Sequence, residues 1–440
     1  MITSNIGRLF LDEYNKRNKT TYNAKDFFLD VFYPLVFGYN KYMVSGGNSP
    51  LENPKISWGD CLRGKKSYET IEEKQNRLNR FVEKVDGGVP EAGIAMGFPT
   101  SDVLATTSGQ TTSMAIGMTA DDAYLSWIGG CLGIGVQGGI CLLVTNVDIL
   151  YDTFEGWQYY RKYLEDFPML KGNQINTWNG KWIAHRYNEE DYDPRRPLAS
   201  FSPLNKAKDD TFDLATESWL DVMYGVATQQ KTTTQMAYIY SLGQMNDTIG
   251  FIPFYLSDIL EPFELYRRIF AGKNIDQVKK LLATEQGLVG CCRMGSIGLS
   301  ALQPKGMRDL ISGKSSPNYK PNNEPELLKF NVYQIYLLAM LNNEQMWEEA
   351  HTIAKDLLDF AASDKKAKTS KANKVNDVLT STSKKVFLEN LTNVIKDLSG
   401  EDDNQTAKFD KVGELVHKMP TENVPYFLTL IRFKYAVLNN

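Results

Sequence analysis

Apolar residues recur at helical spacing in several stretches of the chain. The stripe near the N-terminus consists of Phe27, Phe28, Val31, Phe32, Leu35 and Val36. This spacing predicts that residues 1–45 are largely helical. Residues 67–85 mix charged and apolar positions, and Ser67 or Thr70 is available as an N-cap, so a solvent-facing helix is expected there. Similar patterns predict helices over 147–167 and 262–285.

The pattern changes at residues 174–187, where Asn179-Gly180 lies between two runs rich in Trp, Ile and Thr. An Asn-Gly pair tolerates the positive φ angles of a two-residue type I′ turn. The segment therefore predicts a β-hairpin. Residues 188–211 are polar and rich in proline, which predicts a loop. Residues 249–256 fit either a buried strand or the start of a helix.

The strongest candidate for a linker is the stretch 303–325, which contains four prolines and two glycines. Beyond it, the apolar stripe of one expected helix is made of Phe387, Leu388, Leu391, Val394, Ile395 and Leu398. Together with a second stripe over 424–438, it predicts a bundle of about four helices. The expected class is thus α+β: a mixed, loop-rich body over 1–325 and a helical bundle over 326–440.

Within the body, residues 87–146 are dominated by Gly, Thr, Ser and small apolar residues, and residues 123–144 carry no charge at all. This run of 22 residues is long enough to span a bilayer. Six glycines dilute its hydrophobicity, however, and its flanks hold Asp121, Asp122 and Asp148 but no Lys or Arg to set an orientation. We therefore interpret it as a buried core segment and expect no membrane association.

Composition narrows the class of protein. The 440 residues contain 49 Lys and Arg against 53 Asp and Glu, which gives a net charge of −4. A chain that binds nucleic acid over its whole surface would be basic, so only a local basic patch remains compatible with that function. The five cysteines have no regular spacing, and the N-terminal residues lack an apolar signal core. Both features favour a cytoplasmic protein.

One motif suggests a cofactor. Gly133, Gly135 and Gly138 form a GxGxxG pattern, and Asp152 follows 14 residues later. A dinucleotide site needs a strand before the first glycine and a helix directly after the motif. The preceding segment is itself broken by glycines, so the motif alone is weak. It marks either a nucleotide site of an enzyme or a small-residue segment that lets two backbones pack closely. No catalytic residue, metal ligand or cofactor is predicted, and enzyme activity stays uncertain.

Three local patterns suggest contacts with nucleic acid. The predicted hairpin interleaves Trp178 and Trp182 with Lys181 and Arg186, so that cations could hold phosphates while the rings stack on bases. Amide and hydroxyl side chains surround Gln110 and fill the loop 229–235, where Gln230 and Lys231 are candidates. The structural alternatives are a half-buried hairpin and ordinary strands.

The third pattern is a lysine patch over 364–385, which holds seven lysines and two aspartates. The candidate phosphate contacts in its first half are Lys365, Lys366, Lys368, Lys371 and Lys374. Such a patch could follow a phosphate backbone without reading base sequence. The alternative is a solvated loop between two helices.

This layout resembles the large subunit of type I CRISPR effector complexes (Cascade), on the residues of the hairpin 178–187, the loop 229–235, the lysine patch 365–385 and the last helix around 430–435. The resemblance is one of organisation, so it transfers no individual residue. It implies a subunit without catalysis that recognises a short motif in duplex DNA, helps to open the duplex and holds the displaced strand. Its partners would be DNA, a guide RNA and other subunits of an antiviral defence complex.

Three hypotheses follow. The first is a non-catalytic nucleic-acid-binding subunit of a larger assembly. The second is an enzyme that uses a nucleotide cofactor at Gly133–Gly138. The third is a scaffold protein without a ligand, whose exposed aromatic side chains face partner chains.

Overall fold

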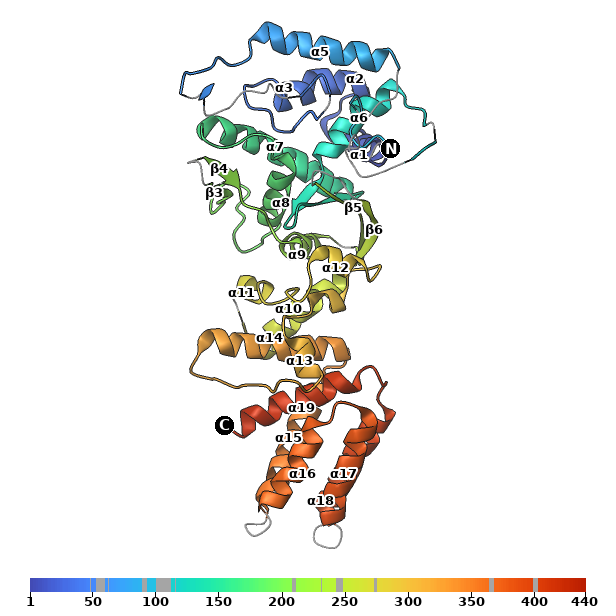
Figure 1. Cartoon of the computed structure of the whole chain (residues 1–440), viewed down its shortest axis with the longest axis vertical. Coiled ribbons are helices and arrows are strands. Elements are labelled where there is room, and N and C mark those ends of the chain that lie inside the picture. Colours follow the sequence, from blue (N-terminus) through green and yellow to red (C-terminus); the bar gives the residue numbers. More distant parts are fainter. Residues whose placement is uncertain are drawn as a thin grey trace. The chain divides into compact units, whose positions relative to one another are not determined.

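The computed structural model describes residues 1–47, 49–52, 60–61, 63–88, 93–99, 112–114, 116–207, 211–230, 232–242, 248–272, 275–363, 368–398 and 403–440 (Figure 1). The chain forms two compact units. The first comprises Met1–Ser257 and Cys292–Ile297, and the second comprises Asp258–Cys291 and Gly298–Asn440. The stretch 303–325 therefore lies inside the second unit, as does the expected boundary at 325/326.

The first unit combines helices with a small sheet, which confirms the α+β class. Its described helices are α1 (Ile2–Asn18), α2 (Ala24–Phe27), a π-helical turn (Phe28–Phe32), α3 (Tyr33–Val36), α5 (Ile71–Asp86), α6 (Ala120–Cys131), α7 (Val147–Asp166), α8 (Ile175–Arg186) and α9 (Trp219–Gln229). Its strands are β1 (Ile134–Val136), β2 (Ile140–Val144), β3 (Leu204–Lys206), β4 (Phe212–Leu214), β5 (Thr234–Ser241) and β6 (Thr248–Tyr255).

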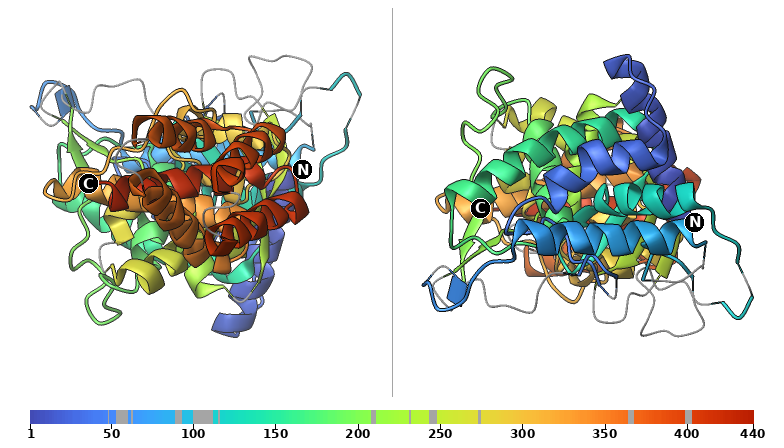
Figure 2. Two further views of the ribbon diagram at one scale, coloured as in Figure 1. Left: turned by 90° about the horizontal axis from the view of Figure 1, so that it is seen from below. Right: turned by 90° about the horizontal axis from the view of Figure 1, so that it is seen from above.

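Two helices predicted from the sequence, those over 67–85 and 147–167, begin at a residue whose side chain caps the helix. Thr70 and Glu73 form a reciprocal capping box at the start of α5, as the Thr70 alternative predicts. At the start of α7, Asn146 accepts hydrogen bonds from the backbone N–H groups of Asp148 and Ile149. Helices α5, α2–α3 and α7 lie side by side (Figures 1 and 2), and aromatic rings join them through Phe28–Phe81 and Phe32–Trp157 contacts.

The glycine motif is part of a β-hairpin. Strands β1 and β2 pair antiparallel with Gly135 opposite Cys141, and the order in the sheet is β1-β2-β5-β6, all antiparallel. The chain after Gly138 enters β2 rather than a helix, so no helix N-terminus is available for a pyrophosphate. The cofactor interpretation of Gly133–Gly138 is therefore wrong in its structural context.

The predicted hairpin at 174–187 is also wrong, because Ile175–Arg186 is helix α8. The Asn179-Gly180 pair lies in the middle of this helix, where Gly180 packs directly against the backbone of β1. A Cβ atom on Gly180 would overlap the carbonyl oxygen of Gly135. Asn179 donates to the carbonyl oxygens of Cys131 and Gly133 at 2.7 and 2.8 Å. Asn179 and Gly180 thus lie at a close contact between α8 and β1. That contact is possible because neither Gly180 nor Gly135 has a side chain.

Both tryptophans of α8 are fully buried. The indole N–H of Trp178 donates to the Gly156 carbonyl oxygen of α7, and that of Trp182 donates to the Asp152 carbonyl oxygen, each at 2.9 Å. Their rings lie stacked 6.5 Å apart in an aromatic cluster with Phe201 and Tyr160. In this position neither ring can stack on a nucleic-acid base, so their predicted role is not compatible with the structure.

The uncharged run 123–144 forms most of α6, then β1 and β2, and its apolar side chains are buried in the first unit. This agrees with its interpretation as a core segment. Across the described residues, helices that combine the length and the apolar character needed to cross a bilayer are not found.

Two buried cations connect α3 and α7 at their C-terminal ends. Arg161 of α7 donates to the carbonyl oxygens of Leu35, Val36 and Lys41 at 2.7–3.1 Å. In return, the ammonium group of Lys41 lies within 2.5–3.3 Å of the carbonyl oxygens of Leu164, in the last turn of α7, and of Phe167, Pro168 and Leu170, which follow that helix. Each cation therefore caps the helix end of the other segment, where the last carbonyl groups lack helical partners.

The second unit is helical in its described residues. Its elements are α10 (Leu256–Phe270), α11 (Ile275–Lys279), α12 (Leu288–Cys292), a 3₁₀ turn (Leu299–Leu302), α13 (Met307–Ile311), α14 (Glu324–Leu341), α15 (Gln345–Ala362), α16 (Lys368–Thr380), α17 (Lys384–Leu398), α18 (Asp403–Lys418) and α19 (Val424–Leu438). The described residues of 326–440 are thus mainly helical, as expected, and they form six helices instead of about four.

The contact between α8 and β1 gives the first prediction. In a Gly180→Ala variant the added methyl group would overlap the Gly135 carbonyl oxygen. We expect the free energy of unfolding to fall by about 1–3 kcal/mol, the usual cost of forcing extra volume into a packed core. Urea denaturation followed by circular dichroism measures it. Gly117→Ala is the control, because a Cβ there has no neighbour within 4 Å; equal midpoints for the two variants would contradict the proposed contact.

Candidate functional site

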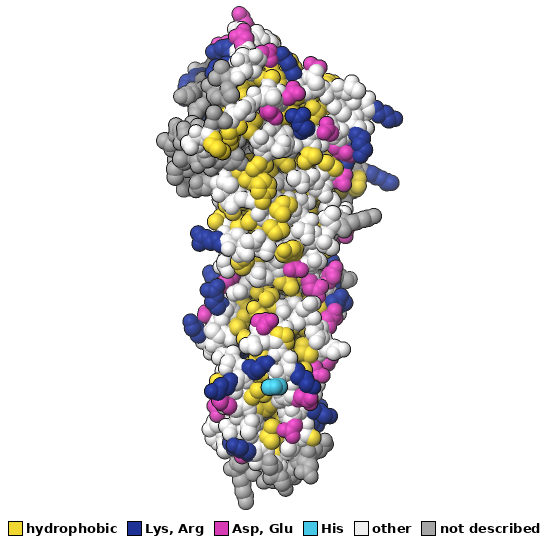
Figure 3. Space-filling view, turned by 90° about the vertical axis from the view of Figure 1, so that its right-hand side faces the viewer, with side chains coloured by type: hydrophobic (Ala, Val, Ile, Leu, Met, Phe, Trp, Pro, Cys, Tyr) yellow, Lys and Arg dark blue, Asp and Glu magenta, His cyan; other side chains and the backbone are white. Residues whose placement is uncertain are grey.

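Charge on the molecule is mixed. On the face drawn in Figure 3, basic and acidic side chains are interspersed, and apolar side chains lie between them. A polyanion would therefore need a local concentration of cations that carry no carboxylate partner.

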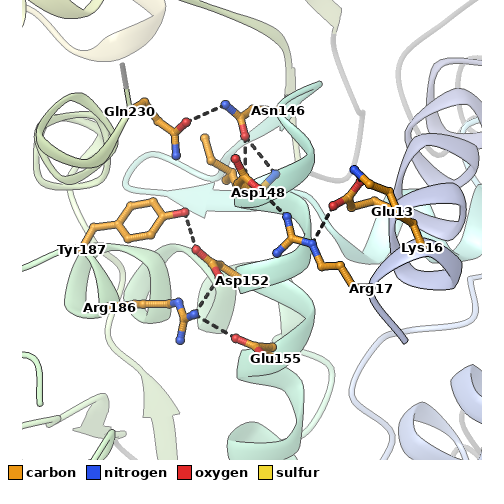
Figure 4. Close-up of polar contacts among 11 residues, drawn as sticks. Glu13, Lys16, Arg17, Asn146, Asp148, Asp152, Glu155, Arg186, Tyr187 and Gln230 are labelled. Atoms are coloured by element: carbon orange, nitrogen blue, oxygen red, sulfur yellow. Dashed lines mark hydrogen bonds and ion pairs between the residues drawn. The ribbon is translucent and has the colours of Figure 1, made fainter. Parts of the chain in front are cut away.

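The cations of α8 are paired with acids. The ammonium group of Lys181 lies 2.6 Å from a carboxylate oxygen of Glu217. The guanidinium group of Arg186 lies 2.7 Å from Asp152 and 2.9 Å from Glu155, both on α7 (Figure 4). Because these bonds use the positive charges within the fold, neither side chain is free to neutralise a phosphate.

Arg186 belongs to a polar network along the first half of α7 (Figure 4). The Tyr187 hydroxyl donates to the second carboxylate oxygen of Asp152 at 2.7 Å, and burial together with this carboxylate raises the pKa of Tyr187. Arg17 of α1 pairs with Asp148. Gln230, a predicted site residue, accepts a 2.9 Å hydrogen bond from the Asn146 side chain. The network holds α1, α8 and the end of α9 to α7.

The described part of the lysine patch is also tied into the fold. Lys371 is only 8% exposed, donates to the Ser363 hydroxyl at 3.0 Å and lies 5.0 Å from the centre of the Phe360 ring. Lys374 pairs with Asp397. Five further candidates have side chains outside the described residues: Gln110, Lys231, Lys365, Lys366 and Lys368. Lys371 and Lys374 thus act as internal ties between helices rather than as free charges.

A cationic groove lies elsewhere, inside the second unit. This lysine groove has a volume of about 590 Å³ and is lined by residues from three stretches of chain, 280–284, 305–318 and 326–333, and by Phe433. Lys280, Lys305 and Lys329 all line it. None of the three forms an ion pair with a described residue, in contrast to Lys181 and Lys374. The groove therefore has what the predicted sites lack: three unpaired cations around one hollow.

The walls of the lysine groove are held by hydrogen bonds. The Tyr333 hydroxyl donates to the Lys305 carbonyl oxygen, and the backbone N–H of Lys305 donates to the Thr284 hydroxyl at 2.8 Å. The backbone N–H of Gly306 donates to Glu285 at 3.1 Å. Asp309 and Glu326 also line the groove, so its lining carries a net charge of +1. Hydroxyl and amide groups of Ser315, Ser316 and Asn318 complete it.

Sequence reasoning missed this groove for two reasons. The three lysines lie about 25 positions apart along the chain, so no local excess of charge marks them. The stretch 303–325 was expected to be a linker, yet its residues Lys305–Asn318 form one wall. Proline and glycine content indicated the irregular backbone around α13, but neither that helix nor the packing of this backbone on α14.

The described residues give little support for thiol or metal chemistry. Burial raises the pKa of the thiols of Cys131 and Cys291, and raises that of Cys141 to about 12, so these cysteines stay protonated at neutral pH. Among the described side chains, no group of three His, Cys, Asp or Glu residues is arranged to hold a metal ion.

Comparison with protein-family models, with curated protein sequences and with solved structures finds no match to this chain.

The network on α7 gives the second prediction. An Arg186→Met variant leaves the carboxylates of Asp152 and Glu155 without their cation. We expect the free energy of unfolding to fall by about 1–3 kcal/mol, as for other hydrogen bonds to charged groups, and affinity for nucleic acid to stay unchanged. Chemical denaturation and a binding titration check the two parts. Arg195→Met, on the loop after α8, serves as the control; a loss of nucleic-acid affinity in Arg186→Met alone would restore Arg186 as a binding residue.

Proposed function

We propose that this chain is a non-catalytic nucleic-acid-binding subunit of a larger assembly, and that the lysine groove of the second unit holds a single strand through its phosphates. The observation that carries the proposal is the convergence of Lys280, Lys305 and Lys329 on one groove without ion-pair partners among the described residues. Lysine ammonium groups bind phosphate as point charges.

The chemistry of the groove favours binding without base recognition. Three ammonium groups neutralise neighbouring phosphates, and the hydroxyl groups of Ser315 and Ser316 are donors for the remaining phosphate oxygens. Phe330 and Phe433 line the groove but are buried, so their rings support its floor rather than stack on bases. Affinity should therefore depend on salt and little on sequence.

A more specific version of this proposal is that the chain acts as the large subunit of Cascade does, because the two resemble each other in organisation. The strand would then be DNA displaced by a guide RNA, the partners would be other subunits of an antiviral defence complex, and the protein would work in the cytoplasm. The lysine patch over 364–385, whose residues 364–367 lie outside the described residues, would add contacts to the same strand.

The third prediction tests the lysine groove. The full chain with Lys280→Glu, Lys305→Glu and Lys329→Glu should bind a short oligothymidine weakly, because three phosphate contacts are lost. The slope of log affinity against log salt should become shallower by about 2, at about 0.7 for each phosphate contact on a single strand. Fluorescence anisotropy at several salt concentrations measures it.

The control carries the same charge change elsewhere in the second unit, at three exposed lysines: Lys355→Glu, Lys396→Glu and Lys418→Glu. It should keep the original slope if the groove is the binding site. Equal losses in the two triple variants would mean that only net charge matters, and the groove would be rejected. A third variant, Lys365→Glu with Lys366→Glu, measures the separate contribution of the lysine patch.

A second candidate function, a scaffold that binds partner chains, is favoured by an apolar face on the sheet. Met236 of β5 and Phe251 and Tyr255 of β6 lie on one face of the sheet. The strand register places residues 236, 251 and 255 on the same side, because side chains alternate between the two faces along a strand. All three are exposed, and Phe251 is 60% exposed. Strand β6 is drawn on the right-hand side of Figure 1. Figure 3 shows that side of the molecule from the front, and apolar side chains are visible on it. Exposed apolar areas of this kind are typical of protein contacts.

The fourth prediction tests this face. Phe251→Ser should change the free energy of unfolding by less than about 0.5 kcal/mol, because the ring is exposed. The tagged variant is purified from its native host after nuclease treatment, and partner chains should be lost from it. Ile71→Ser is the matched control, since Ile71 is 88% exposed on α5. Identical partner recovery from both variants would exclude this face as a docking surface.

A further inference from the structure

The second unit contains a smaller cavity of about 270 Å³, lined mainly by the end of α10 and by α14, α15 and α19. Its walls include Phe270, Tyr319 and Trp347, and its polar groups include Gln334, His351 and Lys434. Only Phe330 lines both this cavity and the lysine groove. The cavity is therefore distinct from the lysine groove and could bind a different ligand.

Lys434 is an unusual lysine within this cavity. It belongs to α19 and is 6% exposed, and its Nζ atom lies 2.8 Å from the centre of the Trp347 ring. No described carboxylate pairs with it, and no hydrogen bond from its ammonium group is seen among the described residues. Burial lowers the pKa of Lys434 to about 7, while the charge of Glu348 opposes this shift. The other titratable groups that line the cavity are His351 and Tyr319.

Two other buried lysines show what Lys434 lacks. Lys41 has four carbonyl oxygens around its ammonium group, and Lys371 donates to Ser363. Those contacts give Lys41 and Lys371 structural roles. Lys434 has only an aromatic ring beside its nitrogen, in a cavity with room for a small molecule.

The charge state decides what the amine can do. An ordinary lysine with a pKa near 10.4 is neutral in only about one molecule in 2,500 at pH 7, whereas a buried lysine with a pKa near 7 is neutral in about half. Only the neutral amine has a lone pair for attack on an electrophilic carbon. Desolvation in an apolar pocket is a known way to activate a lysine as a nucleophile.

We propose that Lys434 is a reactive amine and that its cavity takes a small aldehyde or ketone, which it binds covalently as an imine. The Nζ lone pair forms a bond to the carbonyl carbon, and the proton lost from nitrogen moves to the carbonyl oxygen. The resulting hydroxyl group takes the remaining proton of the nitrogen and leaves as water as the C=N bond forms, so that amine and carbonyl give imine and water. The aromatic walls hold the apolar part of the ligand, and Gln334, His351 and Asn331 are polar groups available to the oxygen.

The fifth prediction is a selective modification of Lys434. The full chain is treated with propanal and cyanoborohydride, which reduces the imine to a stable secondary amine, and peptide mass spectrometry measures the rate at each lysine. Lys385, whose side chain is 85% exposed, is the internal reference. At pH 7 we expect Lys434 to react at least tenfold faster than Lys385. The ratio should fall toward pH 10, because the neutral fraction of Lys434 can rise only about twofold above pH 7, whereas that of an ordinary lysine rises several hundredfold.

Two variants make the test specific. Lys434→Met should abolish the fast modification and leave Lys385 unchanged. Glu348→Gln should increase the modification of Lys434 at pH 6, because it removes the charge that favours the ammonium form; a lysine with a purely structural role would not respond. A Lys434 rate equal to or below that of Lys385 at pH 7, or a ratio that does not vary with pH, would overturn the proposal.

Stability gives an independent measure of the charge state. Between pH 7 and 10.5 the unfolded chain holds a proton on Lys434 that the folded chain lacks, so the free energy of unfolding of the wild type, relative to Lys434→Met, should rise with pH over this range. The contribution is complete above the unfolded pKa and is lost as the pH falls through about 7. Denaturant titrations at several pH values measure it. A flat difference would show that Lys434 keeps its usual proton affinity and would also reject the proposal.

Discussion

The first unit depends on two buried cations that satisfy each other's helix ends. Arg161 binds the last carbonyl groups of α3, and Lys41 binds carbonyl groups in the last turn of α7 and directly after it. A buried chain without such donors would lose several hydrogen bonds at once. Burial lowers the pKa of Lys41 to about 8 and that of Arg161 to about 10, so both remain largely charged at neutral pH. Since residues 42 and 43 also accept the backbone N–H groups of Asn173 and Ile175, the same junction fixes the start of α8.

Local signals in the sequence predicted those elements that local chemistry decides. Thr70 caps α5 and the apolar stripe of residues 147–167 is α7, because capping and helical periodicity act within one turn of chain. The same reasoning failed at Asn179-Gly180, where the pair fits a tight turn equally well. What selects the helix is a contact with Gly135, 45 positions earlier in the chain, and no local pattern contains that information.

The candidate sites show the same limit. Arg186 and Lys181 have the residue types that phosphate binding requires, but whether a cation is free depends on acids that the fold brings to it, here Asp152, Glu155 and Glu217. Conversely, Lys280, Lys305 and Lys329 form no cluster in the sequence and meet only through folding. Composition therefore bounded the function class, whereas the placement of unpaired charge needed the tertiary structure.

The path of the chain through the two units has a consequence for biosynthesis. After Ser257 the chain leaves the first unit, and it returns only for Cys292–Ile297, where Ile297 exchanges backbone hydrogen bonds with Pro253 and Tyr255 at the edge of β6. On the ribosome, the sheet must therefore wait for some forty later residues before its last edge contact can form. A nascent chain released too early would present an unprotected strand edge, which is a common starting point for aggregation.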